Sequence, residues 1–290
     1  MSTELSAAAD APVAVIAGNG ALPSQVVAAL AGRGRKSCIV AIRGEASEET
    51  RARAATELGW GEIGRLYQFL RKTGCRDVLL IGGVSHRPDF GSILGDLGTL
   101  RRLPTIMRAL MGGDDSLLTK VIGLFEVEGY RVVGIKDVAP ELLAKAGALG
   151  RIKPGPDAMR DLELALKATE RLGELDIGQA AVAVAGRVVA LEGAEGTDAM
   201  LQRCRDLRTS GKVRAKGRAG VLVKAAKPHQ DLRVDLPTVG PNTIDLAAAA
   251  QLAGIAIEAG GALIADKEQT LARADAAGLF LYGVERSTVR

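Results

Sequence analysis

Short apolar runs that end at glycines, each followed by an amphipathic segment, recur through the first half of this 290-residue chain. The first run, Val13–Ala17, leads into a glycine turn and then into residues 22–31, which have helical spacing. Further strands and helices are predicted at 38–42, 62–72, 77–81, 100–111, 115–128 and 131–135. This alternation predicts a mostly parallel, doubly wound sheet, in which ligands bind beyond the carboxyl ends of the strands.

The second half of the chain has a more mixed pattern. Residues 151–156, RIKPGP, are rich in proline and glycine and predict a linker. Beyond it, a hairpin is predicted at 182–192, and other elements at 157–172, 200–207, 243–252, 255–258, 262–264, 267–276 and 279–282. We therefore expect an α/β protein with an N-terminal Rossmann-like, parallel-sheet domain at 1–150 and a distinct mixed α/β C-terminal domain at 151–290.

The turn Gly18-Asn19-Gly20-Ala21 lies at a predicted strand–helix junction, where backbone N–H groups can meet a phosphate. It is not a full dinucleotide fingerprint, because Pro23 takes the third glycine position and Arg43, not an acid, ends the second strand. A plain tight turn is the alternative interpretation. Gly82 and Gly83 end the third strand in the same way and are candidates for the same ligand site.

Two further loops carry candidate residues. Arg87, after the third strand, is able to bind a phosphate through two hydrogen bonds, although a surface pair with Asp89 is the favoured interpretation. Asp114 and Asp115 follow two glycines and precede an apolar-periodic segment. Capping of that helix is the default interpretation for them, and metal binding is the alternative.

The segment 193–200, GAEGTDAM, offers both a helix start and oxygen ligands. Thr197 or Asp198 is able to cap the helix that follows, whose N-terminal N–H groups attract anions. Glu195 and Asp198 carry the carboxylates that Mg²⁺ prefers. Capping alone explains Thr197 and Asp198, but not the two glycines and the glutamate beside them.

Residues 231–236 alternate polar and apolar side chains, and this alternation predicts a strand. Asp231, Arg233 and Asp235 would then share one face, shortly after Lys224 and Lys227. Such a face would hold a divalent metal and a phosphate together, whereas a solvated edge strand is the alternative. No Ser-His-Asp or Cys-His arrangement is visible, which favours attack by water over a covalent intermediate.

Composition excludes several classes of protein. Three scattered cysteines without a CxxC motif argue for a reducing compartment and against disulfides or a zinc site. The N-terminus lacks the pattern of a signal peptide, and no apolar run is long enough to span a bilayer, so we expect a cytoplasmic protein. A net charge of +4 without an aromatic platform gives no support for nucleic-acid binding.

Seven blocks, in order from about residue 13 to residue 284, resemble the LpxI-type UDP-2,3-diacylglucosamine pyrophosphatases. They are VIAGNGALP (15–23), VSHRP (84–88), GDDSLL (113–118), LDIGQ (175–179), EGTDAM (195–200), VKAAKPHQDLRVDLPTVG (223–240) and GIAIEAG (254–260). The last three blocks are the most specific. The resemblance implies that water and Mg²⁺ hydrolyse the pyrophosphate of a lipid-linked UDP-sugar, giving UMP and 2,3-diacylglucosamine 1-phosphate (lipid X) for lipid A biosynthesis in Gram-negative bacteria.

The resemblance also implies a nucleotide-binding-like N-terminal domain and a catalytic C-terminal domain with a lipid-binding chamber, with the lipid product between them. We expect a loose peripheral contact with the cytoplasmic face of the inner membrane, and a homodimer is left open. The alternative is a nucleotide-sugar or dinucleotide binding protein without hydrolysis, which would rest on the glycine turn alone.

Carried over residue by residue, the resemblance assigns Asp235 to catalysis, Thr197 to substrate binding, and Lys224 and Lys227 to the phosphates. Asp231 stands where the family also has Glu, whereas His86 looks like an insertion and leaves the role of its loop open. The expected catalytic residues are Asp235, Asp231 and Lys224, and the expected metal ligands are Asp235, Asp231 and Asp198. The expected substrate-binding residues are Gly18, Asn19, Gly20, Ala21, Gly82, Gly83, Arg87, Thr197, Lys227 and Gln230.

Overall fold

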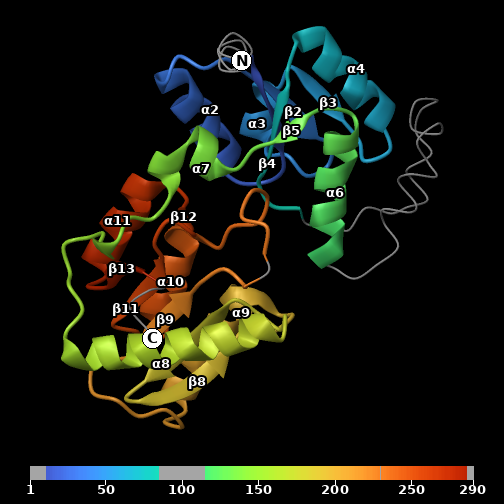
Figure 1. The fold of residues 1–290 in the computed structure, drawn as a ribbon. Coiled ribbons are helices and arrows are strands. Elements are labelled where there is room, and N and C mark those ends of the chain that lie inside the picture. Colours follow the sequence, from blue (N-terminus) through green and yellow to red (C-terminus); the bar gives the residue numbers. More distant parts are fainter. Residues whose placement is uncertain (1–10, 85–114, 229, 286–290) are drawn as a thin grey trace. The chain divides into compact units, whose positions relative to one another are not determined.

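The computed structural model describes residues 11–84, 115–228 and 230–285. The chain forms two compact units, one made of residues 1–140 with Arg233–Asp235 and the other of residues 141–232 with 236–290. The chain therefore leaves the first unit after Pro140, returns to it for three residues, and leaves it again. Both units contain helices packed on a sheet, which confirms the predicted α/β class (Figure 1).

The first unit has a five-stranded sheet that is all parallel, as predicted, and its strand order is β3-β2-β1-β4-β5. Its strands are β1 (Val13–Ala17), β2 (Ser37–Ile42), β3 (Thr56–Leu58), β4 (Asp77–Ile81) and β5 (Arg131–Val132). Its helices are α2 (Leu22–Gly32), α3 (Glu48–Ala52), α4 (Ile63–Thr73), α6 (Asp115–Val127) and α7 (Ile135–Val138), followed by the 3₁₀ turn η2 (Pro140–Leu142).

The central strand β1 is buried along its whole length, as expected of a parallel strand covered on both faces. Tyr67 and Leu70 from α4 and Ile122 and Phe125 from α6 pack on the same face of the sheet. The strand order reverses between β1 and β4, so their carboxyl ends flank the position where open parallel sheets bind ligands. Gly18–Gly20 and Gly82-Gly83 follow these two strands.

The second unit has a six-stranded mixed sheet in the order β6-β13-β11-β9-β7-β8, in which β9, β11 and β13 are parallel. Its strands are β6 (Gly147–Ala148), β7 (Ala180–Val184), β8 (Arg187–Leu191), β9 (Val221–Lys224), β11 (Gly254–Glu258) and β13 (Phe280–Val284). A separate parallel pair joins β10 (Thr238–Val239) to β12 (Leu263–Ile264).

Helices cover both faces of this mixed sheet (Figure 1). Leu162 and Leu166 of α8 (Pro156–Glu174) pack on one face, against Val221, Val223 and Phe280. The opposite face is covered by α9 (Gly196–Thr209), α10 (Pro241–Ala249) and α11 (Lys267–Ala276). None of the helices in the described ranges is both long and apolar enough to cross a membrane.

Two predictions about local structure were wrong. Residues 151–156 do not separate the units, because β6 precedes them and pairs with β13 inside the second unit. Residues 231–236 do not form a strand, since Leu232–Val234 is a turn. Val234 packs against the core of the first unit while Leu232 is 40% exposed, so the alternating apolar residues do not share one buried face.

Candidate active site

The two glycine turns of the first unit are joined to each other by backbone hydrogen bonds. Asn19 N donates to Gly83 O over 2.8 Å, and Gly83 N donates to Asn19 O over 2.9 Å. A Cβ on Gly18 would overlap Gly83 O, and a Cβ on Gly82, whose φ is +101°, would lie 2.8 Å from Gly18 C. Glycine is therefore required where the chain segments cross, which we call the glycine crossover (residues 18–20 and 82–83).

This crossover already uses most of the N–H groups that were expected to meet a phosphate. Besides the two bonds above, Gly18 N donates to Ile81 O and Gly20 N donates to Asn19 Oδ1. The N-terminus of α2, which follows Ala21, has no side-chain cap and no acidic residue in its first turn. We therefore expect an anion to bind at the start of α2 and not at the glycine N–H groups.

Arg43 stands where a dinucleotide-binding unit would carry an acid for the ribose. Its guanidinium lies 2.9 Å from Glu62 Oε2, and Gly59 N donates to the same oxygen. The hydrogen bond from Gly59 is the main cause that holds the pKa of Glu62 below its ordinary value. This end of β2 is thus occupied by an ion pair, which weighs against dinucleotide binding.

Asp235 belongs to the first unit although it lies late in the chain. Val234 packs against the core that α4 and α6 form. Arg233 Nη1 lies 3.0 Å from Glu126 Oε1, and a Cβ on Gly134 would lie 3.1 Å from Arg233 Cα. Asp231 is part of the second unit. The two aspartates that were predicted to share a strand face are therefore carried by different units.

In the second unit, Lys224 ends β9 and its Nζ donates to Thr238 O over 3.2 Å. By strand alternation Lys224 lies on the same face as Leu222, which packs in the cluster under α9, α10 and α11. Asp198 Oδ2 accepts from Asn242 Nδ2 over 2.8 Å, which ties the first turn of α9 to the first turn of α10. Neither helix has a side-chain cap at its N-cap residue.

Thr197 does not face an open space. Its hydroxyl donates to Glu192 Oε1 over 2.8 Å, and both residues are buried. Glu192 Oε2 accepts from Gln179 N over 3.1 Å, so one carboxylate holds the start of α9 and the start of β7 together. Glu192 was missed from the sequence, since the pairing of β7 with β8 brings Gln179 N to it. Glu195, a predicted ligand, instead accepts from Gly193 N and pairs with Arg203.

Lys227 and Gln230 follow the end of β9 and lie on the side of the sheet that α8 covers. Lys227 Nζ pairs with Asp176, while Gln230 Oε1 accepts from Lys227 N over 2.9 Å. Glu258, at the end of β11, accepts from Ala226 N over 3.1 Å. The predicted phosphate ligand Lys227 is therefore already paired with a carboxylate, which a substrate phosphate would have to replace.

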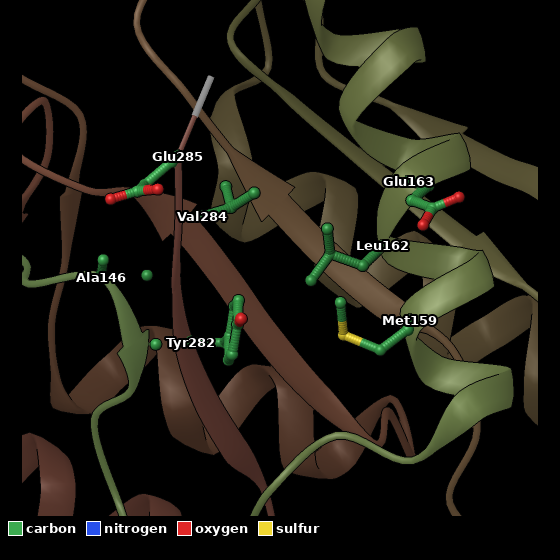
Figure 2. Close-up of a pocket in the computed structure, with 9 residues that line it drawn as sticks. Ala146, Met159, Leu162, Glu163, Tyr282, Val284 and Glu285 are labelled. Atoms are coloured by element: carbon green, nitrogen blue, oxygen red, sulfur yellow. The ribbon is translucent and has the colours of Figure 1, made fainter. Parts of the chain in front are cut away.

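A pocket of about 160 Å³ opens on the α8 side of the second unit, and Figure 2 shows Met159 and Leu162 across it from Tyr282. A cavity of this size holds a ligand as small as benzene. It is too small for the two acyl chains of a diacylated sugar, so the lipid-binding chamber stays a prediction.

In the ranges that the structure covers, no three acidic, histidine or cysteine side chains are grouped so as to hold a metal ion. Of the predicted ligands, Asp235 lies in the first unit and Asp231 and Asp198 lie in the second. Arg87, Asp89 and Asp114 lie outside the described residues. Asp115 is the first residue of α6.

Comparison with known proteins covers nearly the whole chain. The family model of the LpxI N-terminal domain matches residues 12–142, and that of the LpxI C-terminal domain matches residues 145–282. The chain is also 43% identical over 271 residues to the UDP-2,3-diacylglucosamine pyrophosphatase LpxI of Caulobacter vibrioides, which covers 93% of this chain and 96% of the relative. The chain belongs to the LpxI family.

Proposed function

We propose that this protein hydrolyses the pyrophosphate bond of UDP-2,3-diacylglucosamine, with Mg²⁺, to UMP and 2,3-diacylglucosamine 1-phosphate. As a member of its family the chain is a hydrolytic enzyme. The observation that carries the substrate is the near full-length likeness to a relative that is named for it. The reaction would serve lipid A biosynthesis in a Gram-negative bacterium, at the cytoplasmic face of the inner membrane.

Each unit contributes an element suited to a phosphate. In the second unit, Lys224 Nζ donates to Thr238 O, three residues before α10 begins, and the N-termini of α9 and α10 have helix dipoles that favour negative charge. In the first unit, the uncapped start of α2 follows the glycine crossover at the ligand-binding edge of the sheet.

Asp235 is the residue that we assign to the chemical step. Its carboxylate is an oxygen ligand of the kind that Mg²⁺ takes beside substrate phosphate oxygens. Bound there, Mg²⁺ would neutralise charge that builds up on the phosphoryl group. A carboxylate of Asp235 is also able to orient the attacking water and accept its proton. Lys224 holds the phosphate oxygens in place during the attack.

UMP release by the purified protein, measured with and without Mg²⁺, tests this function. Asp235→Asn and Asp235→Ala are expected to lower kcat by about a hundredfold or more, the size of effect that loss of such a group has. Asp157→Asn, at an exposed aspartate on α8, is the matched control and should keep the wild-type rate. Wild-type rates in both Asp235 variants would remove that residue from the mechanism.

The function itself fails if the wild-type protein releases no UMP from the lipid substrate at any Mg²⁺ concentration. Titration with NAD and with UDP-sugars then decides whether the chain is a binding protein. Tight, metal-independent NAD binding without turnover would favour that alternative, against which the Arg43–Glu62 pair argues.

A further inference from the structure

Two buried side-chain amide atoms of the second unit have no hydrogen-bond partner among the residues that the structure describes. They are Gln179 Oε1, an acceptor, and Gln230 Nε2, a donor. Leaving such an atom buried and unpaired destabilises a protein, so native structures keep few of them. An unpaired acceptor and an unpaired donor in the same unit point to a ligand that completes both hydrogen bonds.

The two amides are anchored at the same strand end. Gln179 O accepts from Ala225 N over 3.1 Å, and Gln230 Oε1 accepts from Lys227 N over 2.9 Å. Their anchors are thus two residues apart, just beyond β9. Ala225 packs in the cluster under α8, and Lys227 Cα would lie 3.3 Å from a Cβ on Gly173 of α8. The residues that anchor the two glutamines therefore lie on the α8 side of the sheet.

The amide of Gln230 is held by its side chain, and Gln179 is held by its backbone. The N–H of Lys227 selects the carbonyl end of the Gln230 amide, which leaves Nε2 as the donor. The backbone of Gln179 is bonded on both sides, because its N–H donates to Glu192 and its carbonyl accepts from Ala225. A preformed acceptor and a preformed donor are complementary to a group that has one N–H and one carbonyl.

We propose that Gln179 and Gln230 bind the acylamide at carbon 2 of the glucosamine ring, an inference that rests on the proposed function. Gln179 Oε1 accepts the amide N–H, and Gln230 Nε2 donates to the amide carbonyl. In this substrate carbon 2 adjoins carbon 1, which carries the phosphate. Gln230 Oε1 accepts from the backbone N–H of Lys227, and the resemblance assigns Lys227 to a phosphate. The two glutamines would select an amide-linked chain at carbon 2 over an ester-linked chain.

The test compares the natural substrate with an analogue that has an ester oxygen in place of the amide N–H. The wild-type protein should prefer the amide by about tenfold or more in kcat/KM, because the ester leaves Gln179 Oε1 unpaired. Gln179→Met removes the acceptor at similar size and should bring this ratio close to one. Gln230→Met should lower kcat/KM for both substrates alike, because both retain the carbonyl.

Gln202→Met, at an exposed position on α9, is the control and should change neither rate. Since Gln179→Met removes an unpaired buried acceptor, the free protein should melt at the same temperature or higher. Gln179→Asn, which withdraws the acceptor by one carbon, is a second variant with the same expected loss of selectivity, in case the methionine variant does not fold.

An amide-to-ester ratio that stays at the wild-type value in folded Gln179 variants overturns the proposal, as does a wild-type ratio of one. Calorimetric binding of 2,3-diacylglucosamine 1-phosphate and of its ester analogue gives the same comparison without turnover. If the wild-type protein releases no UMP but binds the amide form in preference, and Gln179→Met abolishes the preference, the proposed function fails and the amide site stands.

Discussion

Arg233 Nη1 lies 3.0 Å from Glu126 Oε1, although 107 positions separate the two residues in the chain. Their side chains are 40% and 50% exposed, so the ion pair itself contributes about 0–1 kcal/mol to stability. The ion pair matters because it fixes the position of a turn. Together with the partly buried Val234, it attaches the turn that carries Asp235 to α6 of the first unit.

Val234 holds this turn on the core of the first unit. Val234→Ala should therefore lower kcat strongly while it lowers the free energy of unfolding only slightly. Loss of its methyl groups loosens the turn, and a displacement of about 1 Å at a reacting group costs up to a hundredfold in rate. We expect a kcat about tenfold to a hundredfold lower, with a loss in the free energy of unfolding of about 1 kcal/mol. Kinetics of UMP release and urea unfolding measure both.

Leu232→Ala is the matched control for that change, because Leu232 lies in the same turn and is 40% exposed. It should leave stability within about 0.5 kcal/mol of the wild type. If Val234→Ala and Leu232→Ala have the same kcat, packing of Val234 does not position Asp235.

The glycine crossover predicts losses of stability of very different size for two adjacent glycines. A Cβ on Gly82 would lie 2.8 Å from Gly18 C, and its φ of +101° is strained for any other residue, so Gly82→Ala should destabilise by about 3 kcal/mol or more. The nearest atom to a Cβ on Gly83 is Asn19 Cβ at 4.0 Å, so Gly83→Ala should cost about 0.5 kcal/mol or less. Equal losses in urea unfolding would contradict the crossing.

Thr197 should act on the structure of the site through Glu192. Thr197→Val removes the hydroxyl that Glu192 Oε1 accepts from and leaves this buried carboxylate short of a donor, so we expect a loss of about 1–3 kcal/mol. Thr197→Ser keeps the hydroxyl and should therefore retain most of the wild-type stability. Chemical unfolding of both variants checks this. A valine variant of wild-type stability but much lower kcat would instead place the hydroxyl on the substrate.

Much of this fold follows from sequence patterns, because its signals are local. Runs such as Val13–Ala17 and Asp77–Ile81 are short, apolar and closed by glycine, and both are strands of the parallel sheet. The role of Gly18 and Gly82 is only partly local. Glycines at strand ends predict turns, but the crossing that demands them depends on the pairing of β1 with β4.

The candidate site was harder to predict, because its contacts join distant parts of the chain. The pattern at 231–236 is a good strand pattern, and it fails because Val234 packs into a core formed by residues about a hundred or more positions earlier. Glu192 belongs to no recognisable sequence pattern, because Gln179 N reaches its carboxylate only through the pairing of β7 with β8. Long-range pairing of this kind leaves no periodic signal.

The last prediction concerns Asp77, which is 3% exposed and accepts from Arg131 at 2.8 Å through both carboxylate oxygens and from Arg35. Burial raises the pKa of this carboxyl, but the hydrogen bonds and charges of the two arginines outweigh burial and hold the pKa below its ordinary value. A depressed pKa means that the ionised form stabilises the fold above the unfolded-state pKa of about 4, and that this stability is lost as the pH falls through the folded-state pKa.

Asp77→Asn should therefore lower the free energy of unfolding by roughly 2–3 kcal/mol at pH 7, somewhat less than for a fully buried pair because Arg131 is largely exposed. The difference from the wild type should stay constant down to about pH 5 and shrink below about pH 4, where the wild-type carboxylate begins to lose its advantage. Urea unfolding at pH 7, 5 and 3.5 measures it, with exposed Asp206→Asn as the control. A gap that is the same at all three values would show that Asp77 stabilises the unit by packing alone, without its charge.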